Sequence, residues 1–205
     1  MKTIENMWKH VLLRAIVISG VGILVGFIFY RYSVFIPTMR PFQFTENSIT
    51  AGLAYAFWKS STSRNMWIAL FIWYILTIEL LVEFNWWLPI LNLAYISGIT
   101  AAIFVYNTVV NKPFVTGMFL RVIFAGVIIA IANGVIVIVL GIFSLNVIAS
   151  HFADWLDAII FNIEIGIVIG LAVGIGIEIA EYLNKKLSEY ELELASSDDV
   201  VHKTN

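Results

Sequence analysis

The stretch "FNIEIGIVIGLAVGIGIEIAEY", residues 161–182, is long enough and apolar enough to cross a membrane as one helix. About 20 consecutive apolar residues are needed to span a hydrocarbon core of about 30 Å. Three glycines, Gly166, Gly170 and Gly174, recur at every fourth position and therefore share one face of that helix. Small residues at this spacing let a second backbone approach closely in lipid. The stretch predicts a membrane helix that packs flush against another helix.

The composition of the chain is typical of a membrane protein. Of the 205 residues, 60% are apolar and 13% are charged, which leaves too few polar side chains to cover a water-soluble domain. There is no cysteine, so disulfides, thiolate metal sites and thiol chemistry are excluded. The apolar run after Lys2, Lys9 and Arg14 continues to Tyr30 without a small-residue cleavage site, which favours a retained membrane helix over a cleaved signal peptide.

Hydropathy predicts an all-α polytopic transmembrane helix bundle. Five segments reach the length of a crossing, at about 11–30, 66–86, 88–110, 115–143 and 157–183. Residues 45–60 are apolar over only half that length, so they form a short tilted span, a re-entrant segment or an interfacial helix. The connection 144–156 is expected to lie along the membrane surface. The prediction is five spans plus a short sixth membrane segment.

The basic residues predict which side of the membrane each turn faces. No Lys or Arg occurs between Arg64 and Lys112 or between Arg121 and Lys185, so the turns within these gaps face away from the cytoplasm. The C-terminus is then cytoplasmic, and the cell inner membrane is the expected location. The side of the N-terminus stays open, because an outside N-terminus with five crossings puts nine of the twelve basic residues inside and an inside N-terminus with six puts ten.

Arg14 lies about one turn inside the first predicted span, and its partner depends on the topology. With the N-terminus outside, Arg14 can pair with Glu79 or Glu164. With the N-terminus inside, it can pair with Glu178 or Glu181, because these residues lie at the opposite end of the last span. The identity of the partner therefore reports on the side of the N-terminus.

Small residues repeat at four-residue spacing in other predicted spans as well, and Asn162 and Glu178 extend the glycine stripe of the last span at either end. Two interpretations stay open. Either these faces pack the helices of one copy against each other, or the stripe of the last span joins copies into a homo-oligomer. The repeats comprise Gly126, Ala130 and Gly134 in the fourth span, Ala94, Gly98 and Ala102 in the third, and Gly22 and Gly26 in the first.

Residues 184–205 are expected to form a cytoplasmic helical extension followed by a disordered tail. Apolar residues are spaced four, three and four apart in this region, as in the seam of a coiled coil; they are Leu183, Leu187, Tyr190 and Leu194. We expect the last three of them to dock a cytoplasmic protein partner. The helix should continue one to three turns past the membrane, and the polar residues 196–205 should be disordered.

Carboxylates inside the predicted spans are the candidate functional groups. A charged group near the bilayer centre costs on the order of 2.5 to 3.5 kcal/mol even on the lenient insertion scale. Glu79, Glu83 and Glu164 are therefore candidates for an ion or proton pathway. In the structural alternative, Glu79 and Glu164 are protonated or are hydrogen-bonded to asparagines within the bundle, because burial disfavours the charged form of a carboxyl group.

No catalytic, nucleotide-binding or metal-binding motif is present. His10, His151 and His202 lie far apart, with neither an HExxH motif nor carboxylates at ligand spacing. We therefore expect no enzyme activity, no cofactor, no metal and no nucleic-acid partner. Two functions stay open. The first is a small oligomeric membrane interaction subunit, such as an anchor, a sensor, or an immunity or defence component, that reaches a cytoplasmic partner through its C-terminal tail. The second is an ion channel or proton-coupled transporter subunit that uses the carboxylates.

Overall fold

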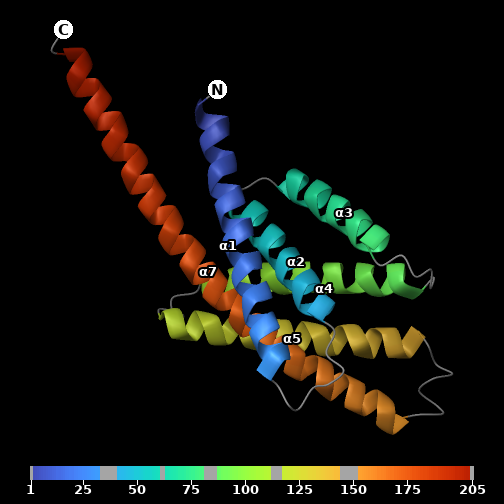
Figure 1. The fold of residues 1–205 in the computed structure, drawn as a ribbon. Helices are drawn as coiled ribbons and strands as arrows, with labels where there is room; N and C mark the ends of the chain where they lie inside the picture. Colours follow the sequence, from blue (N-terminus) through green and yellow to red (C-terminus); the bar gives the residue numbers. More distant parts are fainter. Residues whose placement is uncertain are drawn as a thin grey trace.

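A computed structural model of the chain describes residues 2–32, 41–60, 63–80, 87–111, 117–143 and 152–203. These residues form six α-helices and no strand, so the all-α prediction is confirmed for the described part of the chain. The helices are α1 (Lys2–Tyr32), α2 (Pro41–Lys59), α3 (Ser63–Leu80), α4 (Trp87–Val110), α5 (Met118–Phe143) and α7 (Phe152–Lys203) (Figure 1).

Four helices of the described part are long and apolar enough to cross a membrane, which corrects the expected count of five. The four apolar stretches are Met7–Phe29, Asn92–Val110, Met118–Ile142 and Trp155–Glu193. The predicted span 66–86 is shorter than expected within the described residues, where the apolar part of α3 is Asn65–Thr77, because residues 81–86 lie outside them. Helix α2 covers the predicted short segment 45–60, and its polar residues Glu46, Asn47 and Ser48 keep it below the hydropathy of a long span.

Successive helices run in roughly opposite directions, so α1 begins and α7 ends at the same end of the molecule (Figure 1). Helices α4 and α5 lie side by side and cross α1 at a steep angle (Figure 1). The most extensive helix contact joins α5 to α7, followed by the contacts of α1 with α2 and with α7. Helix α1 is thus held between the hairpin partner α2 and the long helix α7.

The glycine stripe of α7 lies directly against the backbone of α5. A Cβ atom added to any of its three glycines would come within about 3 Å of a Cα atom of α5, closer than nearly all real Cβ contacts. From the added Cβ atom to the Cα atom of the α5 residue, the distances are 2.6 Å for Gly166 and Ala130, 2.7 Å for Gly170 and Gly126, and 3.0 Å for Gly174 and Val122. The stripe is therefore covered by α5 of the same copy, which leaves this face no room to join two copies.

Other small residues bring α1 into close contact with its neighbours. A Cβ atom on Gly26 would lie 2.6 Å from the Cβ atom of Phe44 in α2, and one on Gly176 of α7 would lie 2.9 Å from the Cα atom of Ile18. Ile18 itself is fully buried in the main hydrophobic cluster, which also contains residues of α2, α4, α5 and α7. Close backbone approach thus occurs on two sides of α1 without any hydrophobic driving force from water.

Helix α7 differs from the expectation at both ends. It begins at Phe152, within the connection 144–156 that was expected to lie along the surface; residues 144–151 lie outside the described part. It also continues as a helix to Lys203, well beyond the one to three turns expected after residue 183, and through residues 196–203, for which the sequence predicted disorder. Extending an existing helix adds one hydrogen bond for each residue that is ordered, so polar residues can continue a helix that they could not nucleate.

Candidate functional site

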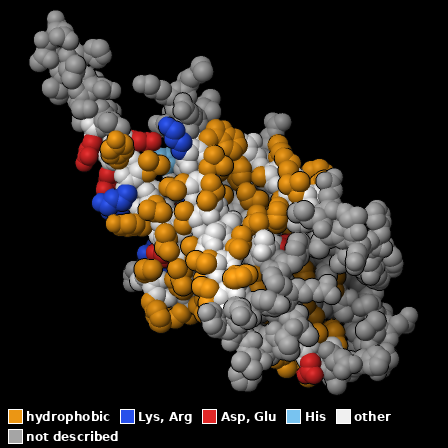
Figure 2. All heavy atoms as spheres, viewed as in Figure 1, with side chains coloured by type: hydrophobic (Ala, Val, Ile, Leu, Met, Phe, Trp, Pro, Cys, Tyr) orange, Lys and Arg blue, Asp and Glu red, His pale blue; other side chains and the backbone are white. Residues whose placement is uncertain are grey.

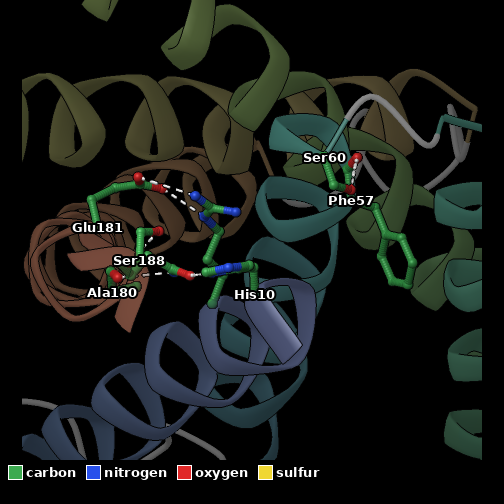
Figure 3. Close-up of polar contacts among 8 residues, drawn as sticks. His10, Phe57, Ser60, Ala180, Glu181 and Ser188 are labelled. Carbon is green, nitrogen blue, oxygen red and sulfur yellow. Dashed lines mark hydrogen bonds and ion pairs between the residues drawn. The ribbon is translucent and has the colours of Figure 1, made fainter. Parts of the chain in front are cut away.

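The strongest polar contact between distant parts of the chain joins Arg14 of α1 to Glu181 of α7. The guanidinium donates from Nε to Oε1 at 2.8 Å and from Nη2 to Oε2 at 3.3 Å, so the carboxylate is bound at both oxygens (Figure 3). The side chain of Tyr55 in α2 lies beside Glu181. Side-chain exposure is 14% for Arg14 and 33% for Glu181, which leaves the pair only partly screened by water. This carboxylate thus links α7 to α1 and lies beside α2.

His10 lies one turn before Arg14 and makes a second contact with α7. Its Nδ1 lies 2.6 Å from Oδ1 of the buried Asn184, whose Nδ2 donates to the carbonyl oxygen of Ala180 at 3.0 Å (Figure 3). That second bond orients the amide so that its oxygen faces the imidazole, and His10 therefore donates from Nδ1. The other ring nitrogen lies 3.7 Å from Oε2 of Glu191. Both partners of the imidazole are hydrogen-bond acceptors.

We refer to His10, Arg14, Glu181, Asn184 and Glu191 as the α1–α7 clasp. The first four of these residues line an open cleft of about 380 Å³. Polar groups in this cleft bind to the protein itself: the hydroxyl of Ser60 donates to the Phe57 carbonyl at 3.0 Å, and that of Ser188 donates to the Asn184 carbonyl at 3.0 Å. No group of three or more His, Asp or Glu residues in the described part could hold a metal ion. The arrangement fixes helices to one another and contains no pairing of a nucleophile with a base.

A second ion pair connects α7 to α5 three residues before the first. Arg121 Nε lies 3.1 Å from Oε1 of Glu178, whose side chain is 13% exposed. Glu178 was predicted from the sequence as the end of the packing stripe, and the structure places it in this ion pair. The two glutamates therefore tie α7 to α5 and to α1 within a single helical turn.

Of the three candidate ion-pathway residues, only the side chain of Glu164 lies in the described part of the chain, and it is not part of this site. Glu164 is exposed on α7 beside the buried Ile165, and Asn162 accepts a hydrogen bond of 2.7 Å from the Tyr95 hydroxyl. Glu79 lies in α3 with its side chain outside the described part, and Glu83 lies outside it altogether. No pathway through the three predicted carboxylates can be followed in the residues that the structure describes.

The helix-packing residues of α5 and the partner-docking residues of α7 have different surroundings. Gly126 and Ala130 face the glycine stripe, and a Cβ atom on Gly134 would lie 2.8 Å from Cγ1 of Ile163. On the extension of α7, Leu187 is half-buried and Tyr190 is 58% exposed, whereas the side chain of Leu194 lies outside the described part. The exposed Tyr190 is therefore available for contact with a partner.

The alternative partners of Arg14 included Glu181, but no sequence motif connected His10 with Asn184. A signal for this contact did exist, because His10 precedes Arg14 by four residues and Asn184 follows Glu181 by three, so each lies on the same helix face as its neighbour. Once the ion pair is known, the second contact follows from helix geometry. Comparison of the chain with protein-family models, with curated proteins and with solved structures gives no match.

Proposed function

We propose that this protein is a small integral membrane interaction or sensor subunit, in which α7 couples the bundle to a cytoplasmic partner. One observation carries this proposal: α7 is a single helix of 52 residues that is packed in the bundle over most of its length and whose C-terminal end continues past the α1–α7 clasp (Figure 1). Such a helix is about 78 Å long, more than twice the thickness of a hydrocarbon core of about 30 Å. Tilting or rotation of its buried half would therefore move the extension.

The proposed topology has both termini in the cytoplasm. The pairing of Arg14 with Glu181 supports it, since this is the partner expected for an inside N-terminus. The helix directions also support it: α2 is antiparallel to α1 and α3 is antiparallel to α2, so the number of crossings is even whether α2 and α3 both span the bilayer or neither does. Arg121 in the first turn of α5 pairs with Glu178, three residues before Glu181, and Lys59 follows Phe57, whose ring contacts Trp8 of α1. These basic residues thus lie near the level of Arg14 or of the start of α1, in line with the positive-inside rule.

The surface of the extension suits a protein partner. Tyr190 and Leu192 are 58% and 72% exposed, and Lys185 and Lys186 are also well exposed beside them. Figure 2 shows most of the charged side chains on this face of the molecule near the extension, while hydrophobic side chains cover the bundle. Exposed aromatic and aliphatic side chains among charged ones are typical of protein contact sites.

In-membrane photo-crosslinking tests this function. A photoreactive amino acid at Tyr190 or Leu192 should give an adduct with a protein of the cytoplasm, because both side chains project from the extension. The same amino acid at Ile160, an exposed apolar position in the bundle part of α7, is the matched control and should give adducts with lipid or membrane protein only. Absence of any cytoplasmic adduct from both extension positions would contradict the proposed coupling.

The alternative, an ion channel or proton-coupled transporter subunit, has less support because Glu164 is exposed on the outside of the bundle. Its test is ion flux into liposomes that contain the purified protein. Flux that is abolished by Glu79→Gln and Glu164→Gln together would favour this alternative over the interaction subunit. Deletion of residues 184–205 should leave such flux intact and should abolish the coupling proposed above.

A further inference from the structure

Helix α2 buries three consecutive polar side chains among its neighbours. Glu46 is 4% exposed, and Asn47 and Ser48 are fully buried. Helices α1, α3, α4 and α7 all contact α2, so these side chains lie inside the helix bundle. Glutamate is almost never buried to this degree unless it is paired.

Glu46 has no such partner among the side chains that the structure describes. Its Oε1 is inaccessible to solvent and accepts no hydrogen bond, and no cationic side chain of the described part pairs with it. On α2 itself the polar groups that follow are also unpartnered, since both amide atoms of Asn47 and the hydroxyl of Ser48 make no hydrogen bond. Among the described residues, nothing donates to the buried Oε1 or supplies the opposite charge that would stabilise the ionised form of the carboxyl group.

The contact between α2 and α3 shows what lies beside Glu46. The indole Nε1 of Trp73 donates to the Thr50 hydroxyl at 3.2 Å, which sets the register of these two antiparallel helices (Figure 1). Glu46 is one turn before Thr50 and Thr77 is one turn after Trp73, so antiparallel register brings Glu46 and Thr77 to the same level. Thr77 is fully buried, and its hydroxyl donates to the Tyr74 carbonyl at 2.8 Å, so its oxygen keeps lone pairs that can accept.

The charged side chains that the structure describes on the surrounding helices are exposed or make other contacts. Arg14 of α1 and Glu181 of α7 lie by Tyr55, nine residues further along α2. Helix α4 carries no charged residue and contributes the buried Asn92, whose Nδ2 is unpartnered. The charged residues of α3 are Arg64 and Glu79, whose side chains lie outside the described part.

From these observations we propose that Glu46 is a proton-binding site inside the bundle, with its carboxyl group held as the neutral acid at neutral pH. The ligand is one proton from water, which converts the carboxylate to the carboxylic acid with no other bond made or broken. An unpaired carboxylate in an apolar interior is far less favourable than its protonated form. The acid hydroxyl can then donate to an oxygen at its level, such as that of Thr77. This site is separate from the α1–α7 clasp and goes beyond the coupling role of α7.

Infrared spectroscopy of the full-length protein in lipid tests this site. The wild-type protein should show the carbonyl stretch of a protonated carboxylic acid at neutral pH, with a shift on exchange into deuterated water. Glu46→Gln should lose this band, whereas Glu164→Gln, which alters an exposed carboxyl on α7, should retain it. Absence of the band from the wild type, or its loss in Glu79→Gln but not in Glu46→Gln, would overturn the assignment.

Thermal unfolding of the same variants gives an independent measurement. Glutamine resembles the neutral acid in shape and does not titrate, so Glu46→Gln should match the wild type in stability at acidic pH, below the ordinary pKa of a glutamate. At neutral pH Glu46→Gln should be the more stable protein, because the wild-type carboxyl group ionises there in the unfolded chain but stays protonated in the folded state. A large loss of stability in Glu46→Gln at neutral pH would instead show that an ionised, paired carboxylate is required, and it would overturn the proton site.

Discussion

The ion pair of Arg14 with Glu181 has a contribution to stability that can be bounded from its geometry. Pairs fully exposed to water contribute about 0.2 to 1 kcal/mol, and removing one partner of a fully buried pair costs about 3 to 5 kcal/mol. With exposures of 14% and 33% and two hydrogen bonds to the carboxylate, this pair lies between these limits. We expect a coupling free energy of about 1 to 3 kcal/mol.

A double-mutant cycle measures that coupling. Arg14→Ala, Glu181→Ala and the double variant would be unfolded reversibly in detergent, and the coupling taken as the departure of the double variant from additivity. The pair of Lys186 with Glu189 is the matched control. It lies on the same helix with side chains 60% and 45% exposed, and it should couple by well under 1 kcal/mol. The exchanged pair Arg14→Glu with Glu181→Arg should recover part of the stability that either reversal alone removes.

Two results would refute this reasoning. A coupling for Arg14 and Glu181 no larger than that of the exposed control would mean that the two side chains do not meet in the folded protein. A full loss of stability from Arg14→Ala that is unchanged by also replacing Glu181 would mean that Arg14 has a different partner. In the second case the N-terminus would be expected on the other side of the membrane, where Glu164 lies.

Further predictions concern the other helix contacts. Gly170→Leu should destabilise the protein by about 3 kcal/mol or more, since a Cβ atom there would lie 2.5 Å from the Ala125 carbonyl oxygen, and the backbone cannot move aside as a side chain can. The control is Gly20→Leu, at a position with open space. Equal thermal unfolding midpoints for the two variants would contradict the close contact. Asn184→Leu should remove the acceptor of His10 and raise hydrogen exchange in residues 183–193, measured by mass spectrometry, and unchanged exchange would mean that this contact does not hold the extension.

Much of the fold was predictable because helices in lipid have strong sequence signals. Long apolar runs marked α1, α4, α5 and α7, and the four-residue spacing marked the face on which α7 packs. The spacing could not predict which helix covers that face, because any helix with small residues at the contact can pack closely against it. It therefore left open the choice between contacts within one copy and contacts between copies.

The polar sites were harder to predict for two physical reasons. Hydropathy treats α2 as a weak span because of Glu46 and its neighbours, and it cannot show that these side chains are buried by other helices. His10 and Asn184 carry no motif of their own, and they meet only because α1 and α7 are antiparallel, 174 residues apart in the chain. Helix propensity likewise underestimated the extension, since residues 196–203 continue a helix that begins far upstream.

Helix α7 lies by its glycine face on α5 of the same copy, and one disulfide measures this directly. The chain has no cysteine, so Gly134→Cys with Ile163→Cys introduces a single pair. A Cβ atom on Gly134 lies 2.8 Å from Cγ1 of Ile163, which is compatible with the Cβ separation of about 3.5 to 4.5 Å in a disulfide. Oxidation in the membrane should give a monomer cross-linked within one chain, identified by mass spectrometry of the joined peptides. A disulfide-linked dimer, or two free thiols after oxidation, would contradict it.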